Sequence, residues 1–221
     1  MTSLDTEILQ RCSQIGSSTW ADALDSLEID GVTQGITLRA GAGRVIGQAV
    51  TARHIWGQLG DFDRADFAVG RLIEATGSGK ILVIDAGGQA ISTFGGIASK
   101  AAALRHATAV LIDGACRDVD EIKQTGLWMA SRHVTPLTGK TRLHLQEMGG
   151  QVSLGGIAVS QGDLIVGDET GIVVIPFNRI EQTLAAAQDI LLVDNEVQAA
   201  VDRGVSFTEA AAAANYIPAR V

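Results

Sequence analysis

Several residue types and patterns that define specialised classes of protein are scarce or missing in this chain. Its 221 residues include two cysteines, three prolines and 4% aromatic residues. No apolar run approaches the roughly 20 residues needed to cross a bilayer, and the start, MTSLDTEILQ, lacks the basic flank and apolar stretch of a secretory signal. Cys12 and Cys116 cannot form a disulfide framework and lack the spacing of a zinc site. These absences predict a cytoplasmic protein with free thiols and no membrane contact.

Basic side chains are also in deficit. There are 17 Lys and Arg against 25 Asp and Glu, which gives a net charge of -8, and such a balance argues against a protein that holds nucleic acid through its phosphates. The chain is instead rich in hydrophobic residues (46%) and in glycine (26 residues). This composition and length suit an α/β or α+β protein with many turns and a sizeable core. We expect one domain over residues 1–221, without repeats or a linker.

The pattern of apolar residues predicts an α/β fold with a mixed sheet. The runs ILVIDA and AVLIDG are almost continuously apolar, as expected of strands covered on both faces. GRVIGQAVTARHI reads as a further strand, and QVSLGGIAVSQGDLIVGDETGIVVIP predicts antiparallel hairpins. A helix over WADALDSL is expected to have Ser18 or Thr19 as its N-cap and Asp22 near its positive end. The other predicted helices cover residues 4–15, 66–75, 97–106, 119–124, 179–200 and 207–214.

Several common chemistries find weak support. TGSGK precedes its strand and lacks the spacing of a phosphate-binding loop, and DAGGQ is not the glycine motif of a dinucleotide fold. The histidines show no close ligand spacing. No lysine lies inside an apolar strand, where desolvation would prepare it for Schiff-base chemistry. Cys116 next to Arg117 is a minor candidate for a nucleophile, and a small buried thiol is the commoner role at such a position.

The segment ATAVLIDGACRDVDEIKQTG is the densest cluster of charged residues after a predicted buried strand. It brings Asp113, Arg117, Asp118, Asp120 and Glu121 into one turn and the first turn of a helix. A guanidinium there can bind a carboxylate through two hydrogen bonds, and a neighbouring carboxylate with water can hold a hard cation such as Mg²⁺. This pair suits a 2-oxo acid, because a metal chelated by the substrate draws off charge as a C–C bond breaks and an enolate forms. The alternative is structural: the acidic residues complement the helix dipole and Arg117 forms an ion pair.

These motifs together resemble the RraA-like family, which includes 4-hydroxy-4-methyl-2-oxoglutarate and 4-carboxy-4-hydroxy-2-oxoadipate aldolases, often with oxaloacetate decarboxylase activity. The resemblance runs through STWADAL, GQAVTA, ILVIDAGG, FGGIASKAA, IDGACRDVDEI and GGIAVSQGDLIVGDETGIVVIP, and so covers most of the chain. It implies an α/β fold, a swivelling β/β/α sandwich with a mixed sheet and C-terminal helices. It also implies assembly as a homotrimer or homohexamer, with sites between subunits.

The resemblance implies a role for each residue of the segment and its neighbours. Arg117 and Asp118 would be catalytic: Arg117 grips the substrate carboxylate, and Asp118, with Glu121, holds Mg²⁺ (or Mn²⁺). Backbone N–H groups of Gly95, Gly96, Ile97 and Ala98 would cradle the pyruvyl part.

One position departs from the pattern. The family aldolases have an aspartate 21 positions before the arginine, where this chain has Gly96. Two main readings follow. The first is a divalent-metal-dependent lyase that releases pyruvate from a 2-oxo acid, favoured because Asp118 and Glu121 are kept. The second is a catalytically silent binding protein of the ribonuclease E regulator type, favoured by Gly96, and a different enzyme on the same scaffold is a third alternative.

Overall fold

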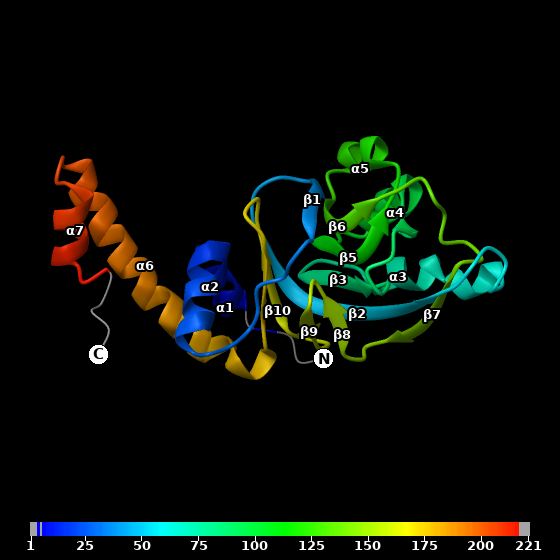
Figure 1. The fold of residues 1–221 in the computed structure, drawn as a ribbon, viewed down its shortest axis with the longest axis horizontal. Helices are drawn as coiled ribbons and strands as arrows, with labels where there is room; N and C mark the ends of the chain where they lie inside the picture. Colours follow the sequence, from blue (N-terminus) through cyan, green and yellow to red (C-terminus); the bar gives the residue numbers. More distant parts are fainter. Residues whose placement is uncertain (1–3, 5, 217–221) are drawn as a thin grey trace.

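The computed structural model describes residue 4 and residues 6–216, and a mixed sheet forms the centre of this part of the chain (Figure 1). The sheet has nine strands among the described residues, in the order β1-β6-β5-β3-β2-β10-β11, with β4 paired to β5 and β7 paired to β2. The strands are β1 Thr37–Ala40, β2 Val45–Trp56, β3 Lys80–Asp85, β4 Ser92–Phe94, β5 Ala109–Cys116, β6 Trp128–Val134, β7 Leu143–Met148, β10 Leu164–Gly167 and β11 Ile172–Ile175. A separate ribbon pairs β8 Val152–Leu154 with β9 Ile157–Val159. The predicted α/β fold with a mixed sheet is confirmed.

The middle of the sheet is parallel and covered on both faces. β3 lies between β2 and β5, and β5 lies between β3 and β6, all in parallel register. Since side chains alternate along a strand, Val83 and Leu111 pack under the β8–β9 ribbon, whereas Leu82 and Val110 pack under helices α3, α4 and α5. Those helices are Val69–Ala75, Gly96–Leu104 and Val119–Thr125. This two-sided burial explains why the runs ILVIDA and AVLIDG are almost wholly apolar.

A second group of helices covers the β10–β11 end of the sheet. α1 (Thr6–Ser13), α2 (Ser17–Ser26) and the start of α6 (Ile180–Asp202) share an apolar core with β10 and β11. α6 then runs away from the sheet, and α7 (Phe207–Ala213) folds back along it (Figure 1). The outer part of this pair exposes Leu192 (63%) and Phe207 (56%). No helix in the described part of the chain is long and apolar enough to span a membrane.

Two predicted details of the helices are wrong. α2 begins at Ser17 after Gly16, which offers no side-chain cap, so Ser18 and Thr19 lie inside the helix and Asp22 lies near its middle. The cap comes from a distant turn: Asp168 accepts hydrogen bonds from the Ser17 amide (2.9 Å) and hydroxyl (2.7 Å). The helix expected over residues 66–75 is split into a 3-10 turn, η1 (Arg64–Phe67), and α3, because Ala68 adopts a left-handed φ of 45°.

Candidate functional site

Arg117 and Asp118 follow directly on the end of the buried strand β5, as the sequence predicted. The Arg117 amide donates to the Phe94 carbonyl (3.0 Å), which ties this turn to the end of β4. Asp118 adopts a left-handed φ of 55°, which aspartate tolerates better than most residues. Its carbonyl accepts the Ile122 amide (3.0 Å) and so opens α5. The turn therefore presents both side chains at the carboxyl edge of the parallel strands.

Gly95 allows a close approach between this turn and the start of α4. A Cβ atom built on Gly95 would lie 2.6 Å from Asp118 Oδ2 and 3.0 Å from Arg117 Cγ, which leaves no room for a side chain. The next amide, of Gly96, donates to Asp118 Oδ2 at 3.2 Å. The sequence therefore needs glycine at residue 95 to bring the loop that precedes α4 against Arg117 and Asp118.

Glu121 occupies the space beside the next residue, Gly96. A Cβ atom built on Gly96 would clash with Glu121 Oε2 and would lie 2.7 Å from Glu121 Cβ. The carboxylates of Asp118 and Glu121 thus lie against two consecutive glycines. An acidic group is present at the place where a side chain of residue 96 would have pointed.

The beginning of α4 adds backbone donors to the same place. Gly95 is the N-cap of the helix, and the N–H groups of Ile97 and Ala98 in the first turn have no acceptor within the helix. Such a helix start favours a negatively charged ligand. Arg117 Nε lies 3.3 Å from Asp118 Oδ2, with both side chains more than a third exposed. The structure thus brings Gly95, Gly96, Ile97, Ala98, Arg117, Asp118 and Glu121 together.

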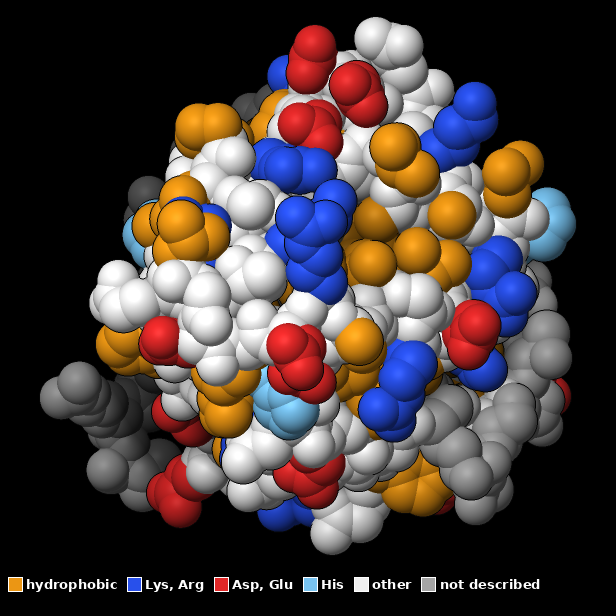
Figure 2. All heavy atoms as spheres, turned by 90° about the vertical axis from the view of Figure 1, so that its right-hand side faces the viewer, with side chains coloured by type: hydrophobic (Ala, Val, Ile, Leu, Met, Phe, Trp, Pro, Cys, Tyr) orange, Lys and Arg blue, Asp and Glu red, His pale blue; other side chains and the backbone are white. Residues whose placement is uncertain are grey.

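All of these residues except Gly96 line one cavity of about 300 Å³. Figure 2 views the molecule from the side of η1 and α3, where Lys and Arg side chains lie beside hydrophobic ones. The apolar part of the lining comes from η1, α3 and β4, and includes Phe67, Ile73 and Phe94. Its polar part includes Thr93, Thr138 and Lys140, which were not predicted from the sequence. Thr138 and Lys140 come from the β6–β7 loop, and no motif links that loop to the segment around Arg117.

Asp113 does not belong to this site, which corrects the expectation that it joins Arg117 in one turn. It lies within β5, is 5% exposed, and accepts hydrogen bonds from Arg132 Nε (2.6 Å) and Nη2 (3.2 Å) and from the Gly155 amide (2.7 Å). The hydrogen bond to Asp113 raises the pKa of Arg132, although burial opposes it. Asp113 is therefore a structural partner of Arg132 that ties β5 and β6 to the β8–β9 ribbon.

Cys116 is not prepared to act as a nucleophile. Burial raises the pKa of its thiol, and the contact with Ser131 Oγ at 3.4 Å offsets this only in part. A thiol with a raised pKa carries little of the reactive thiolate at neutral pH. Both cysteines are free, as predicted, and both are buried.

A metal ion at this site would rely on few protein ligands. Within residue 4 and residues 6–216, no group of three or more His, Cys, Asp or Glu side chains is placed to hold a metal ion. Asp118 and Glu121 form a pair of carboxylates, and Mg²⁺ is commonly held by one or two carboxylates together with water and substrate oxygens. The residues present fit a hard divalent cation whose other ligands are water or substrate oxygens.

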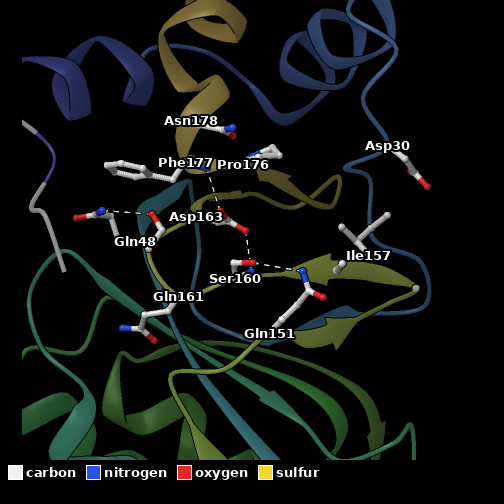
Figure 3. Close-up of a pocket in the computed structure, with 13 residues that line it drawn as sticks. Asp30, Gln48, Gln151, Ile157, Ser160, Gln161, Asp163, Pro176, Phe177 and Asn178 are labelled. Atoms are coloured by element: carbon white, nitrogen blue, oxygen red, sulfur yellow. Dashed lines mark hydrogen bonds between the residues drawn. The ribbon is translucent and has the colours of Figure 1, made fainter.

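A wider hollow among the described residues lies elsewhere. It has a volume of about 780 Å³, lies between the β8–β9 ribbon and the start of η2 (Phe177–Arg179), and is lined mainly by amide and apolar side chains (Figure 3). Its buried acid, Asp163, already accepts hydrogen bonds from the Ser160 amide (2.7 Å) and the Phe177 amide (2.9 Å). This hollow has no Lys or Arg in its lining, so it lacks the chemistry found around Arg117.

Comparison with known proteins places the chain in a sequence family. Residues 18–174 match the family model RraA-like, described as Aldolase/RraA. Protein DlpA of Legionella pneumophila is 24% identical over 92% of this chain, which spans only 33% of that protein's length. An uncharacterized protein of Methanocaldococcus jannaschii is 31% identical over 72% of this chain and 74% of its own. A Halalkalibacterium halodurans protein named "Putative 4-hydroxy-4-methyl-2-oxoglutarate aldolase" is 28% identical over 85% of both chains.

Solved structures share the fold. An uncharacterized protein from Pseudomonas syringae is similar with a TM-score of 0.82 and 25% identity, over 95% of this chain and 99% of the other. RraAS2 of Streptomyces coelicolor, described as an unusual member of the RNase ES inhibitor RraA family, has a TM-score of 0.74 at 24% identity, over 84% and 93% of the two chains. The similarity to RraAS2, at 24% identity, shows a shared fold alone.

Proposed function

This chain belongs to the RraA-like family, and from that premise we propose that it is a divalent-metal-dependent lyase that cleaves or decarboxylates a 2-oxo acid and releases pyruvate. One observation carries the proposal: Arg117, two carboxylates and the start of α4 line a single cavity. The aldolase name of the relative from Halalkalibacterium halodurans supports the same class of reaction.

Arg117 and the start of α4 would bind the acid end of the substrate. The guanidinium offers paired donors that match a carboxylate, and the N–H groups of Ile97 and Ala98 offer further donors to the substrate's anionic end. The ion pair with Asp118 holds Arg117 in place from one side. These contacts orient the substrate, so that its 2-oxo group is directed toward Asp118 and Glu121.

Asp118 and Glu121 would hold Mg²⁺ or Mn²⁺. When bound, the ion supplies a Lewis acid that favours negative charge on the 2-oxo oxygen. In an aldol cleavage the C3–C4 bond breaks, the C4 hydroxyl loses its proton, and C3 gains one to give pyruvate. In a decarboxylation of oxaloacetate the C4 carboxylate leaves as CO₂ and C3 is protonated in the same way. Both reactions release pyruvate.

The substitution of Gly96 for the acidic residue of the family aldolases does not remove negative charge from this place. Glu121 lies where that side chain would point. This is the observation that favours the lyase over a catalytically silent protein of the ribonuclease E regulator type. A regulator would have no need of a carboxylate restored at this point.

The proposal extends to assembly and location. We propose a homotrimer or homohexamer in the cytoplasm, without nucleic-acid or membrane partners. Exposed apolar side chains on the α6–α7 pair, among them Leu192 and Phe207, support association between copies of the chain. Two buried free cysteines fit a reducing compartment.

The decisive experiment measures pyruvate release from 4-hydroxy-4-methyl-2-oxoglutarate and from oxaloacetate, coupled to lactate dehydrogenase. Reactions contain Mg²⁺, Mn²⁺ or EDTA, and a no-enzyme control corrects for spontaneous decarboxylation. We expect metal-dependent release that Arg117→Ala and Asp118→Ala each reduce roughly 100-fold or more. Lys123→Ala, at the exposed end of α5, is the matched control and keeps full activity. Unchanged turnover in both site variants would show that the reaction does not take place in this cavity. No pyruvate release from either substrate would favour the catalytically silent regulator.

A further inference from the structure

The cavity that contains Arg117 has a second basic side chain, Lys140, in its lining. Lys140 lies on the loop between β6 and β7, on a different part of the chain from the segment around Arg117. None of the ion pairs found among residue 4 and residues 6–216 includes Lys140. A lysine that faces a cavity without an acidic partner is available to an anionic ligand.

The loop that carries Lys140 is fixed against the strand that leads into the site. The Ser92 amide of β4 donates to the Leu137 carbonyl (3.0 Å), and Ser92 and Thr138 form a parallel bridge. Gly139 makes this approach possible, because a Cβ atom built there would lie 2.5 Å from the Ser92 carbonyl oxygen and 2.7 Å from the Phe67 ring. The backbone of Lys140 is therefore positioned by the same strand that positions Gly95.

The turn itself is closed by hydrogen bonds on both sides of Lys140. The Lys140 amide donates to Thr138 Oγ1 (3.3 Å), and the Leu143 amide donates to the Gly139 carbonyl (2.8 Å). These hydrogen bonds hold the backbone of the loop in place in the cavity wall. The side chain of Lys140 is exposed.

A buried hydroxyl in the same lining also lacks a partner. Thr93, between Ser92 and Phe94 in β4, is fully buried, and its Oγ1 atom makes no hydrogen bond in the structure. A buried polar atom without a partner is costly and calls for an explanation. Because this oxygen is fully buried, it is a polar atom behind the cavity wall and not a surface contact for a ligand.

The polar groups of the lining come from separate segments of the chain, with apolar side chains in the same wall. Arg117 follows β5, the backbone donors open α4, and Lys140 comes from the β6–β7 loop, while Phe67, Ile73 and Phe94 are apolar. We infer that Lys140 binds a second, distal carboxylate, so that the site selects 2-oxo acids with two carboxylates over those with one. This inference rests on the proposed function for the role of Arg117 and extends it to the choice of substrate.

A binding experiment with unreactive ligands tests Lys140 independently of turnover. 2-Oxoglutarate and 2-oxopentanoate have the same chain length and differ only in whether the far end is a carboxylate or a methyl group. Neither has the C4 hydroxyl or the C4 carboxylate that the proposed reactions need. Their affinities are measured by titration calorimetry on the full chain with Mg²⁺ present, for the wild type, Lys140→Met and Lys140→Arg.

We expect the wild type to bind 2-oxoglutarate about tenfold more tightly than 2-oxopentanoate. This ratio of affinities is what one additional charge-assisted hydrogen bond contributes. Lys140→Met should remove that preference and leave the affinity for 2-oxopentanoate unchanged, whereas Lys140→Arg should keep it. Lys100→Met, an exposed lysine on α4, is the matched control and should also keep it. No preference in the wild type, or the same preference in Lys140→Met, would overturn the inference.

The two proposals fail in different ways. If binding shows the Lys140-dependent preference and 4-hydroxy-4-methyl-2-oxoglutarate still releases no pyruvate, the lyase is wrong and Lys140 keeps its role in binding a dicarboxylate. If pyruvate is released but the affinities of the two ligands are equal, the lyase stands and the assignment of Lys140 is wrong.

Discussion

Glu121 and Gly96 share one space in this protein. The carboxylate of Glu121, from the first turn of α5, fills the position that a side chain on Gly96 would need at the start of α4, where a Cβ atom would lie 2.7 Å from Glu121 Cβ and 2.8 Å from Glu121 Cδ. One acidic side chain fits there at a time. A sequence comparison at residue 96 alone would conclude that the charge is lost, but the structure shows a carboxylate supplied by a neighbouring helix.

This relationship predicts that the two positions can exchange their roles. Gly96→Asp alone should reduce metal-dependent pyruvate release about tenfold or more, because two carboxylates compete for one place. The double variant Gly96→Asp with Glu121→Ala should recover most of that loss. The measurement is kcat/KM as a function of Mg²⁺ concentration. A double variant no more active than Glu121→Ala alone would show that the carboxylates are not interchangeable.

Asp118→Asn should separate the catalytic effect of the Asp118 charge from the role of this residue in the fold. Asparagine also tolerates the left-handed φ of 55° and can still accept the Gly96 amide. We expect the free energy of unfolding to change by less than about 0.5 kcal/mol, while pyruvate release falls roughly 100-fold. Urea unfolding followed by circular dichroism checks the first part and the coupled assay the second. A large loss of stability would mean that Asp118 acts mainly in the fold.

Arg132→Met should destabilise the protein without acting on the site. It leaves the Asp113 carboxylate, 5% exposed, with the Gly155 amide as its hydrogen-bond donor. Breaking a buried pair by removing one partner costs about 3 kcal/mol. Chemical unfolding measures this, with Asp120→Asn on the surface of α5 as a control. A loss below about 1 kcal/mol would contradict the structural role given to this pair.

His54 should make stability depend on pH in mild acid. Burial lowers the pKa of His54 to about 4, outweighing the contact of Nε2 with the Phe67 carbonyl, which raises it, and His144 lowers it further. The unfolded chain therefore takes up a proton on this residue below about pH 6.5, while the folded chain does so only near pH 4. The resulting stability is present above pH 6.5 and is lost as the pH falls toward 4, by about 3 kcal/mol. His54→Phe should lack this slope in urea unfolding measured from pH 7 to 4, and an identical slope in both proteins would assign it to other groups.

The sequence predicted the central strands and the helices between them because each has a strong local signal. Two-sided burial makes β3 and β5 almost wholly apolar, and α4 and α5 follow their strands closely. The position of Arg117 and Asp118 at the end of β5 followed from the same pattern. What failed were features that depend on distant residues, such as the cap of α2, which comes from Asp168 rather than Ser18 or Thr19.

The candidate site could be predicted for two segments, the one around Arg117 and, through the family resemblance, residues 95–98. Arg117, Asp118 and Glu121 lie within five residues of one another, so one motif contains them all. Lys140 and Thr93 reach the cavity through the pairing of Ser92 with Thr138, and Asp113 leaves it because Arg132 binds it on the neighbouring strand. These contacts depend on tertiary packing, which a sequence pattern does not record.

The burial of strand β5 determines which parts of the protein unfold last. All eight of its residues are buried, and it is bonded on both edges, whereas α7 lies at the outer end of α6. Its amide hydrogens should exchange with solvent only through global unfolding, while those of α7 exchange through local fraying. Because Arg117 and Asp118 directly follow β5, partly opened forms that keep the centre of the sheet also keep these residues in place. Activity under rising denaturant should then disappear together with the last protected amides, not before them.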